Sequence, residues 1–163
     1  ALAGLDRAPW RLLVVGDGPA RASVRKAFAR FGRRVHWLGA RGESELRGIY
    51  VASDLLVWPG INEAIGMAIL EAQAAGLAAV VGDVGAAAAI VAEPHTGTLV
   101  KEGDAAAFRR AVAAFLRVPE KIRAAMSDAA SDTAWAFHDL ATAADQLDRV
   151  LRGAAACAKA RRR

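Results

Sequence analysis

The chain has 163 residues, of which 55% are apolar and 24% are charged, a composition typical of one globular domain with its own core. Its formal net charge of +5 favours an anionic partner such as nucleotide phosphates or acidic lipid. Nucleic acid is the weakest candidate among anionic partners, because no nucleic-acid-binding motif accompanies the charge. The single cysteine, Cys157, excludes an internal disulfide, and no apolar run is long enough to span a membrane.

Short apolar runs alternate with helical patterns along the chain. The run Leu12–Val15 predicts a first strand that stops at the turn Gly16–Pro19. A basic stretch with a helical pattern follows, and it contains no acid. Its cations are Arg21, Arg25, Lys26, Arg30, Arg33 and Arg34. We interpret this stretch either as a solvated helix face or as a docking surface for anionic lipid.

Further strands and helices follow in alternation. Strands are predicted at 35–38, 54–58, 79–81 and 98–100. Helices are predicted at 43–52, 66–75, 86–91, 120–131 and 133–151. One more helix is predicted to begin after Asp104, which would be its N-cap. Because the strands are short and apolar on both faces, the fold class is α/β, a Rossmann-like open parallel β-sheet flanked by helices. We expect one domain over residues 1–152 and a disordered basic tail over 153–163.

The loop Pro59–Gly66 carries the most informative chemistry. Ligands of open parallel sheets bind at the carboxyl ends of the strands, and this loop leaves such an end and leads into a helix. Gly66 has no side chain, so a phosphate could approach the unpaired amides of Gly66 and the two residues after it. Glu71 lies about one and a half turns further along, where it could accept two hydrogen bonds from the diol of a ribose. Glu63 would lie nearer the outer end of the phosphate.

The segment Asn62–Gly76 resembles the E-x7-E block of retaining GT-B glycosyltransferases of family 4. Further segments match that family in order and spacing, namely Val15–Pro19, Trp37–Gly39, Asp54–Pro59 and Thr96–Val100. The resemblance covers roughly residues 10–118. It implies that the chain is the C-terminal, donor-binding half of a GT-B fold. The chain departs from the family pattern at Ala64, Ile65, Ala78 and the pair Gly85-Ala86.

The resemblance also assigns roles to residues. It implies that Glu63 is catalytic and contacts the donor hexose, and that Glu71 binds the ribose. The implied donor-binding residues are Gly16, Gly39, Glu63, Ile65, Gly66, Met67, Ala68 and Glu71. The co-substrate would be a UDP- or GDP-linked sugar, and we expect neither a metal site nor a tightly bound cofactor.

We therefore expect a hexosyltransferase that moves a hexose from a nucleoside diphosphate sugar to an acceptor hydroxyl with retention, in polysaccharide or glycolipid biosynthesis. In the family, an acceptor-binding domain and a further strand–loop–helix unit with an Arg and a Lys precede this region, so the chain alone should be inactive. Without that strand, the edge of Leu12–Val15 would be unpaired, which favours a homodimer through it. The expected location is cytoplasmic, at the inner face of the membrane.

Other functions stay open at this point. The chain could be a non-catalytic nucleotide-binding or regulatory module of the same fold, or a sugar-nucleotide epimerase of the GT-B type. A nicotinamide dehydrogenase is disfavoured, because Gly16 and Gly18 lack a third glycine where Arg21 stands.

Overall fold

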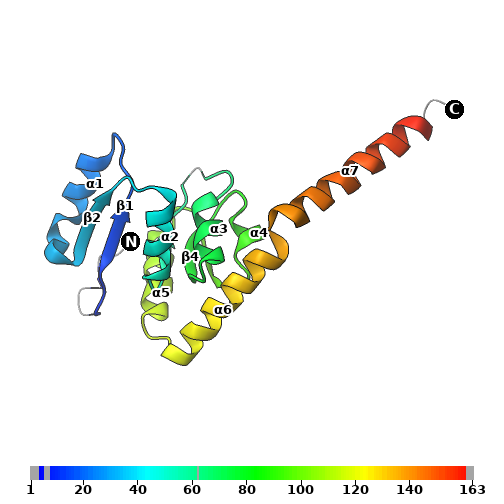
Figure 1. Ribbon diagram of the computed structural model, residues 1–163. Coiled ribbons are helices and arrows are strands. Elements are labelled where there is room, and N and C mark those ends of the chain that lie inside the picture. The colour runs from blue at the N-terminus through cyan, green and yellow to red at the C-terminus, as the bar shows by residue number, and fades with distance from the viewer. Residues whose placement is uncertain (1–3, 6–7, 62, 161–163) are drawn as a thin grey trace.

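The computed structural model describes residues 4–5, 8–61 and 63–160. In these residues the strands form two parallel sheets (Figure 1). One sheet pairs β1 (Leu12–Val15) with β2 (Val35–Gly39). The other has the order β3 (Leu56–Trp58), β4 (Ala79–Asp83) and β5 (Gly97–Lys101). The predicted α/β class with parallel strands is thus confirmed.

A single continuous sheet was expected, and the strands instead form two. The reason is that, within the described residues, β1 pairs only with β2 and β3 pairs only with β4, so no described strand joins the two edges. The predicted unpaired side of Leu12–Val15 is therefore present in this part of the chain. A homodimer through that edge stays a prediction.

Strand β4 forms the centre of the larger sheet. Side chains alternate between the two faces of a strand, and both faces of β4 are covered. Ala79 and Val81 pack on one side in a cluster with Ile69. Val80 packs on the other side in a cluster with Phe108. This double burial explains why β4 reads as a continuous apolar run rather than an alternating one.

Helices cover the sheets, and their bounds follow the predicted pattern closely in the first part of the chain. They are α1 (Arg21–Phe28), its 3-10 continuation η1 (Ala29–Arg34), α2 (Glu43–Val51), α3 (Met67–Ala74), α4 (Ala87–Ile90), α5 (Ala105–Phe115), α6 (Glu120–Phe137) and α7 (Leu140–Ala160). The predicted N-cap is confirmed, since Asp104 accepts a hydrogen bond of 2.8 Å from the amide of Ala107. Gly76 follows the end of α3 with a φ of 78°, as predicted for a C′ glycine.

The last two helices differ from the prediction. The break was expected near residue 132, but α6 runs on to Phe137. Ala130 and Ala134 are buried on this helix, so packing holds it straight through the expected break. The next helix begins instead after Asp139, whose carboxylate Oδ1 accepts a hydrogen bond of 2.6 Å from the amide of Thr142.

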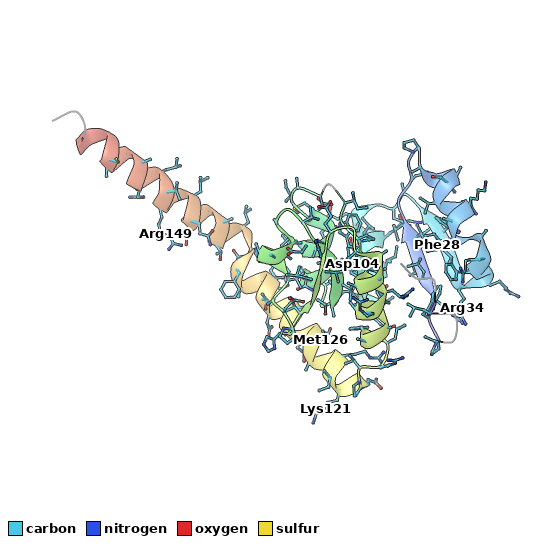
Figure 2. All side chains as sticks on the ribbon, turned by 180° about the vertical axis from the view of Figure 1, so that it is seen from behind. Phe28, Arg34, Asp104, Lys121, Met126 and Arg149 are labelled. Carbon is cyan, nitrogen blue, oxygen red and sulfur yellow. The ribbon has the colours of Figure 1, made fainter. Side chains whose placement is uncertain are left out.

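Helix α7 projects away from the rest of the molecule (Figure 1), and Arg149 lies on this projecting helix (Figure 2). It remains helical to Ala160, through most of the segment 153–163 where we expected a disordered tail. The high alanine content of this segment explains its helicity, because alanine has the strongest helix propensity. Residues 161–163 lie outside the described residues, and the domain division at residue 152 stays a prediction. No helix in the described residues is both long and apolar enough to cross a membrane.

The small sheet is covered by an aromatic cluster combined with arginines. The rings of Phe28 and Trp37 meet edge to face, with centroids 6.2 Å apart. The guanidinium of Arg25 lies 5.3 Å from the ring centre of Trp37. The guanidinium of Arg34 lies 5.2 Å from the ring centre of Trp10. Part of the basic stretch thus contributes to packing through cation–π contacts rather than standing free in solvent.

Candidate functional site

Two glycines that we predicted to border a ligand lie together at the carboxyl ends of β1 and β2. The amide of Gly16 donates a hydrogen bond of 2.8 Å to the carbonyl oxygen of Gly39. Both residues have positive φ, 115° for Gly16 and 72° for Gly39, a conformation that side chains disfavour. The two strand ends therefore turn away from the sheet through positions at which only glycine is unstrained.

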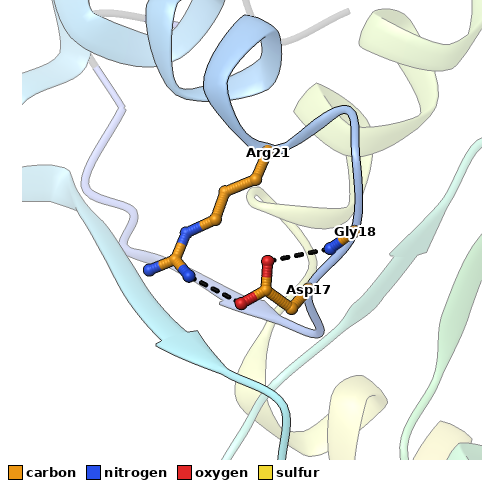
Figure 3. Close-up of polar contacts among 3 residues, drawn as sticks. All are labelled: Asp17, Gly18 and Arg21. Atoms are coloured by element: carbon orange, nitrogen blue, oxygen red, sulfur yellow. Dashed lines mark hydrogen bonds and ion pairs between the residues drawn. The ribbon is translucent and has the colours of Figure 1, made fainter.

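The turn between β1 and α1 is organised by Asp17 (Figure 3). Its Oδ1 accepts a hydrogen bond of 2.8 Å from the amide of Gly18, and its Oδ2 forms an ion pair of 2.6 Å with Nη1 of Arg21. Both charged side chains are partly exposed, so the pair contributes little to stability. It does fix the loop and holds a carboxylate in front of α1.

Glu63 is held against the start of α3. Its Oε1 accepts a hydrogen bond of 3.0 Å from the amide of Gly66, and its side chain is half-buried. Glu63 thus satisfies one of the amides that the helix start would otherwise leave unpaired. The carboxylate keeps further acceptor capacity for a ligand, since it can accept about four hydrogen bonds in all.

Gly66 has a packing role in addition to the role that its sequence context predicts. We expected its missing side chain to let a phosphate approach. In the structure, a Cβ at this position would lie 3.1 Å from Cδ1 of Ile69 and 3.5 Å from Cδ1 of Ile90, both side chains of the core. The φ of Gly66 is also 79°, in the left-handed region. The glycine therefore allows the chain to enter α3 tightly against the core.

The loop that carries Glu63 is supported by glycines that the sequence did not single out for packing. A Cβ on Gly85 would collide with the carbonyl oxygen of Glu63 and lie 2.6 Å from that of Ala64. A Cβ on Gly82 would collide with the carbonyl oxygen of Pro59. Both glycines lie at the end of β4 or just after it, so their position at a strand end is the signal that could have identified them.

The start of α3 is open to solvent on its other side. Ile65 is 63% exposed and Met67 is 52% exposed, and Ala68 is half-buried. The amides of Met67 and Ala68, the first two residues of the helix, cannot reach a carbonyl acceptor within it, and the helix dipole adds a partial positive charge. An anion such as a phosphate can therefore approach the amides of Met67 and Ala68.

Glu71 lies further along α3 and is exposed. Its Oε2 accepts a hydrogen bond of 3.3 Å from the hydroxyl of Tyr50, in the last turn of α2. Burial of the phenol, followed by the charge of Glu71 and this hydrogen bond, raises the pKa of Tyr50 to about 12. Sequence reasoning missed Tyr50, although a phenol just before the strand ahead of the Glu63 loop was visible in the sequence.

The beginning of α2 is also fixed by side chains. Nη1 of Arg41 lies 3.0 Å from Oε1 of Glu45, whose other oxygen accepts a hydrogen bond from the amide of Gly42. The amide of Gly42, and then Arg41, hold the pKa of Glu45 below its usual value. Helix α2 thus runs from the segment after Gly39 to the contact with Glu71.

The predicted residues therefore form two groups. Gly16 and Gly39 contact each other, and Glu63, Gly66 and Glu71 lie on or before α3. Helix α2, which follows Gly39 in the chain, connects the two groups through the hydrogen bond from Tyr50 to Glu71. Among the described residues, no cluster of three or more His, Cys, Asp or Glu could hold a metal ion.

The parallel sheets flanked by helices, with glycine turns at their strand ends, define an α/β domain of the GT-B type. Residues 1–117 match the family model described as Glycosyl transferases group 1, and the chain belongs to this family. The D-inositol 3-phosphate glycosyltransferase of Corynebacterium glutamicum is 36% identical to the chain over 112 residues, which are 69% of the chain and 27% of that protein.

Solved structures share the fold. A sucrose-phosphate synthase from Thermosynechococcus elongatus superposes with a TM-score of 0.79 at 24% identity, over 96% of the chain and 41% of that structure. Anabaena Alr3699/HepE in complex with UDP-glucose superposes with a TM-score of 0.77 at 23% identity, over 91% of the chain and 43% of that structure. The chain thus spans about a quarter of the curated relative and less than half of each of these structures.

Proposed function

We propose that this chain is the donor-binding domain of a glycosyltransferase that transfers a hexose from a nucleoside diphosphate sugar to an acceptor hydroxyl with retention. The observation that carries the proposal is the arrangement at α3. One carboxylate, Glu63, lies at the helix start against the amide of Gly66, and a second, Glu71, stands exposed on the same helix. Between them, first-turn amides are open to an anion.

The comparisons support this proposal at the level of chemistry. The relative from Corynebacterium glutamicum is named as a D-inositol 3-phosphate glycosyltransferase, and Alr3699/HepE, which shares the fold, was solved with UDP and with UDP-glucose. A nucleoside diphosphate sugar presents a ribose diol, a diphosphate and a hexose in sequence. That order corresponds to Glu71, the first-turn amides and Glu63 along α3.

Each group would then have a distinct part in the reaction. The amides of Met67 and Ala68 would bind the diphosphate and stabilise the charge that develops on it as it leaves, which is the main contribution such a site can make. Glu63 would contact the donor hexose through its remaining acceptor positions. Glu71 would hold the ribose, while Gly16 and Gly39 would border the phosphates and the base.

The acceptor would be bound outside this chain. We propose that an acceptor-binding domain precedes it in the whole protein, and that this domain together with an Arg/Lys-bearing unit completes the site. The chain alone should then bind a donor weakly and transfer nothing. Docking of the basic stretch on anionic membrane lipid, and a cytoplasmic location, remain predictions.

The proposal is tested by titrating the chain with UDP and UDP-glucose in a calorimeter. We expect both to bind, and Glu71→Gln to weaken the binding of UDP by about 1–3 kcal/mol, because charged hydrogen bonds to the ribose are lost. The dideoxy analogue of UDP, which lacks both ribose hydroxyls, should bind the unsubstituted chain and the Glu71→Gln variant with equal affinity.

The matched control is Glu120→Gln, which removes the same charge from an exposed residue at the start of α6. It should leave the affinity for UDP unchanged. Equal affinity of Glu71→Gln and the unsubstituted chain for UDP would contradict the ribose assignment. Release of free hexose or transfer by this chain alone would contradict the need for an upstream domain.

A further inference from the structure

The contact between Tyr50 and Glu71 joins two helices at the proposed ribose position. Tyr50 lies in the last turn of α2 and Glu71 in the middle of α3, and these helices pack against each other. Tyr50 is half-buried, whereas Glu71 is exposed. The hydroxyl of Tyr50 donates to Oε2 of Glu71 at 3.3 Å. A fixed side chain thus holds one oxygen of a side chain that would otherwise move freely in solvent.

In this hydrogen bond the hydroxyl of Tyr50 is the donor and the carboxylate of Glu71 is the acceptor. Burial and the negative charge of Glu71 raise the pKa of Tyr50 to about 12, so the phenol keeps its proton and must act as the donor. A carboxylate accepts hydrogen bonds and donates none. Oε1 of Glu71 and the remaining lone pairs of Oε2 are left for a ligand that donates hydrogen bonds.

We propose that Tyr50 is a positioning residue, which orients the carboxylate of Glu71 to accept hydrogen bonds from both hydroxyls of a ribose. This inference rests on the proposed function, because it takes Glu71 as the ribose ligand. An exposed glutamate loses rotamer freedom when it binds a ligand, and a carboxylate that is already oriented loses less.

The test compares UDP with its dideoxy analogue on four forms of the chain: unsubstituted, Tyr50→Phe, Glu71→Gln and the double variant. Phenylalanine keeps the packed ring and removes only the donor. Tyr50→Phe should weaken the binding of UDP by about 2- to 10-fold, because the side chain of Glu71 would then be ordered only when the ligand binds. It should leave the affinity for the dideoxy analogue unchanged, and it should have no further effect on UDP when Glu71 is already Gln.

A second measurement reports the contact itself. Tyr50 is the only tyrosine of the chain, so the ultraviolet absorption of tyrosinate follows its ionisation alone. We expect the titration to be centred near pH 12 in the unsubstituted chain and at lower pH in Glu71→Gln, because the neighbouring charge is gone. An unchanged midpoint in Glu71→Gln would overturn the contact on which the proposal depends.

The outcomes separate the two levels of the argument. If Tyr50→Phe weakens the binding of UDP and of the dideoxy analogue equally, or weakens the binding of neither, Tyr50 has no positioning role, whether or not Glu71 binds the ribose. If Glu71→Gln binds UDP with the same affinity as the unsubstituted chain, the proposed ribose ligand is wrong, and the inference about Tyr50 fails with it. If Glu71→Gln loses affinity for UDP and Tyr50→Phe does not, the inference about Tyr50 is wrong and the proposed role of Glu71 stands.

Discussion

The two sheets of this molecule are stabilised in different ways. In the larger sheet, the first residues of β4 are buried and helices cover both of its faces. In the smaller sheet, which the structure describes in full, Val35 is the single buried residue of β1 and β2, and α1 contains no buried residue. There, rings and arginines stacked on them take the place of a buried aliphatic core.

This difference bears on the candidate site because the site draws on both parts. Glu63 and Glu71 belong to the larger, well-packed part, and Gly16 and Gly39 belong to the smaller one. A rigid support under α3 suits groups that must hold charge in a fixed geometry. A nucleotide bound by both parts would stabilise the folded chain, because it would bind the native state and not the unfolded one.

The largest expected effect comes from deleting core atoms under α3. Ile69 is fully buried, so Ile69→Ala should lower the free energy of unfolding by about 2–5 kcal/mol, through lost burial and the cavity left behind. Leu13→Ala on β1 is the control, because Leu13 is 39% exposed and should cost about 1.5 kcal/mol or less. Denaturant unfolding followed by circular dichroism measures both. Equal losses would show that the two sheets are packed alike.

A smaller effect is expected where loops approach each other through glycine. Gly82→Ala would place a methyl group against the carbonyl oxygen of Pro59, and the backbone shift needed should cost about 1–3 kcal/mol. Gly18→Ala is the matched change beside the smaller sheet, where no atom lies within 4 Å of the added Cβ. It should leave the free energy of unfolding unchanged or raise it slightly, because alanine restricts the unfolded chain. Similar losses in the two variants would contradict this contrast.

The sequence predicted strands in both parts of the molecule, including Leu12–Val15 and the strand that begins at Val35 in the smaller one. Local signals were sufficient for the strand Ala79–Val81, for Asp104 as a cap and for Gly76 after α3, because each depends on residues close in the chain. The break between α6 and α7 was misplaced because burial of Ala134 carries α6 past residue 132, and because Asp139, which caps the start of α7, was not singled out in the sequence. The division into two sheets could not be derived from local patterns, since it depends on which strands meet in space.

Within the candidate site, the spacing of Glu63 and Glu71 was readable from the sequence, and their immediate partners were not. The contact of Tyr50 with Glu71 joins residues 21 apart, and no periodic pattern indicates it. The packing of Gly85 against the Glu63 loop likewise follows from the fold of two separate loops. Motif spacing thus locates candidate groups, whereas their orientation depends on tertiary contacts.

The smallest expected effect tests how the smaller sheet is held together. Arg25→Gln removes the cation that lies over Trp37, and it should lower the free energy of unfolding by about 0.5–1 kcal/mol. Lys26→Gln removes the same charge from the next residue, which is stacked on no ring of the described residues. Because no acid stands between Asp17 and Glu43, removing a positive charge there should by itself relieve repulsion, so Lys26→Gln should be neutral or slightly stabilising. Denaturant unfolding of both variants at low and high salt separates ring stacking from charge repulsion, because salt screens the repulsion between exposed charges. If the two variants changed stability equally, net charge rather than ring stacking would govern this part of the molecule, and the contrast between its two sheets would rest on burial alone.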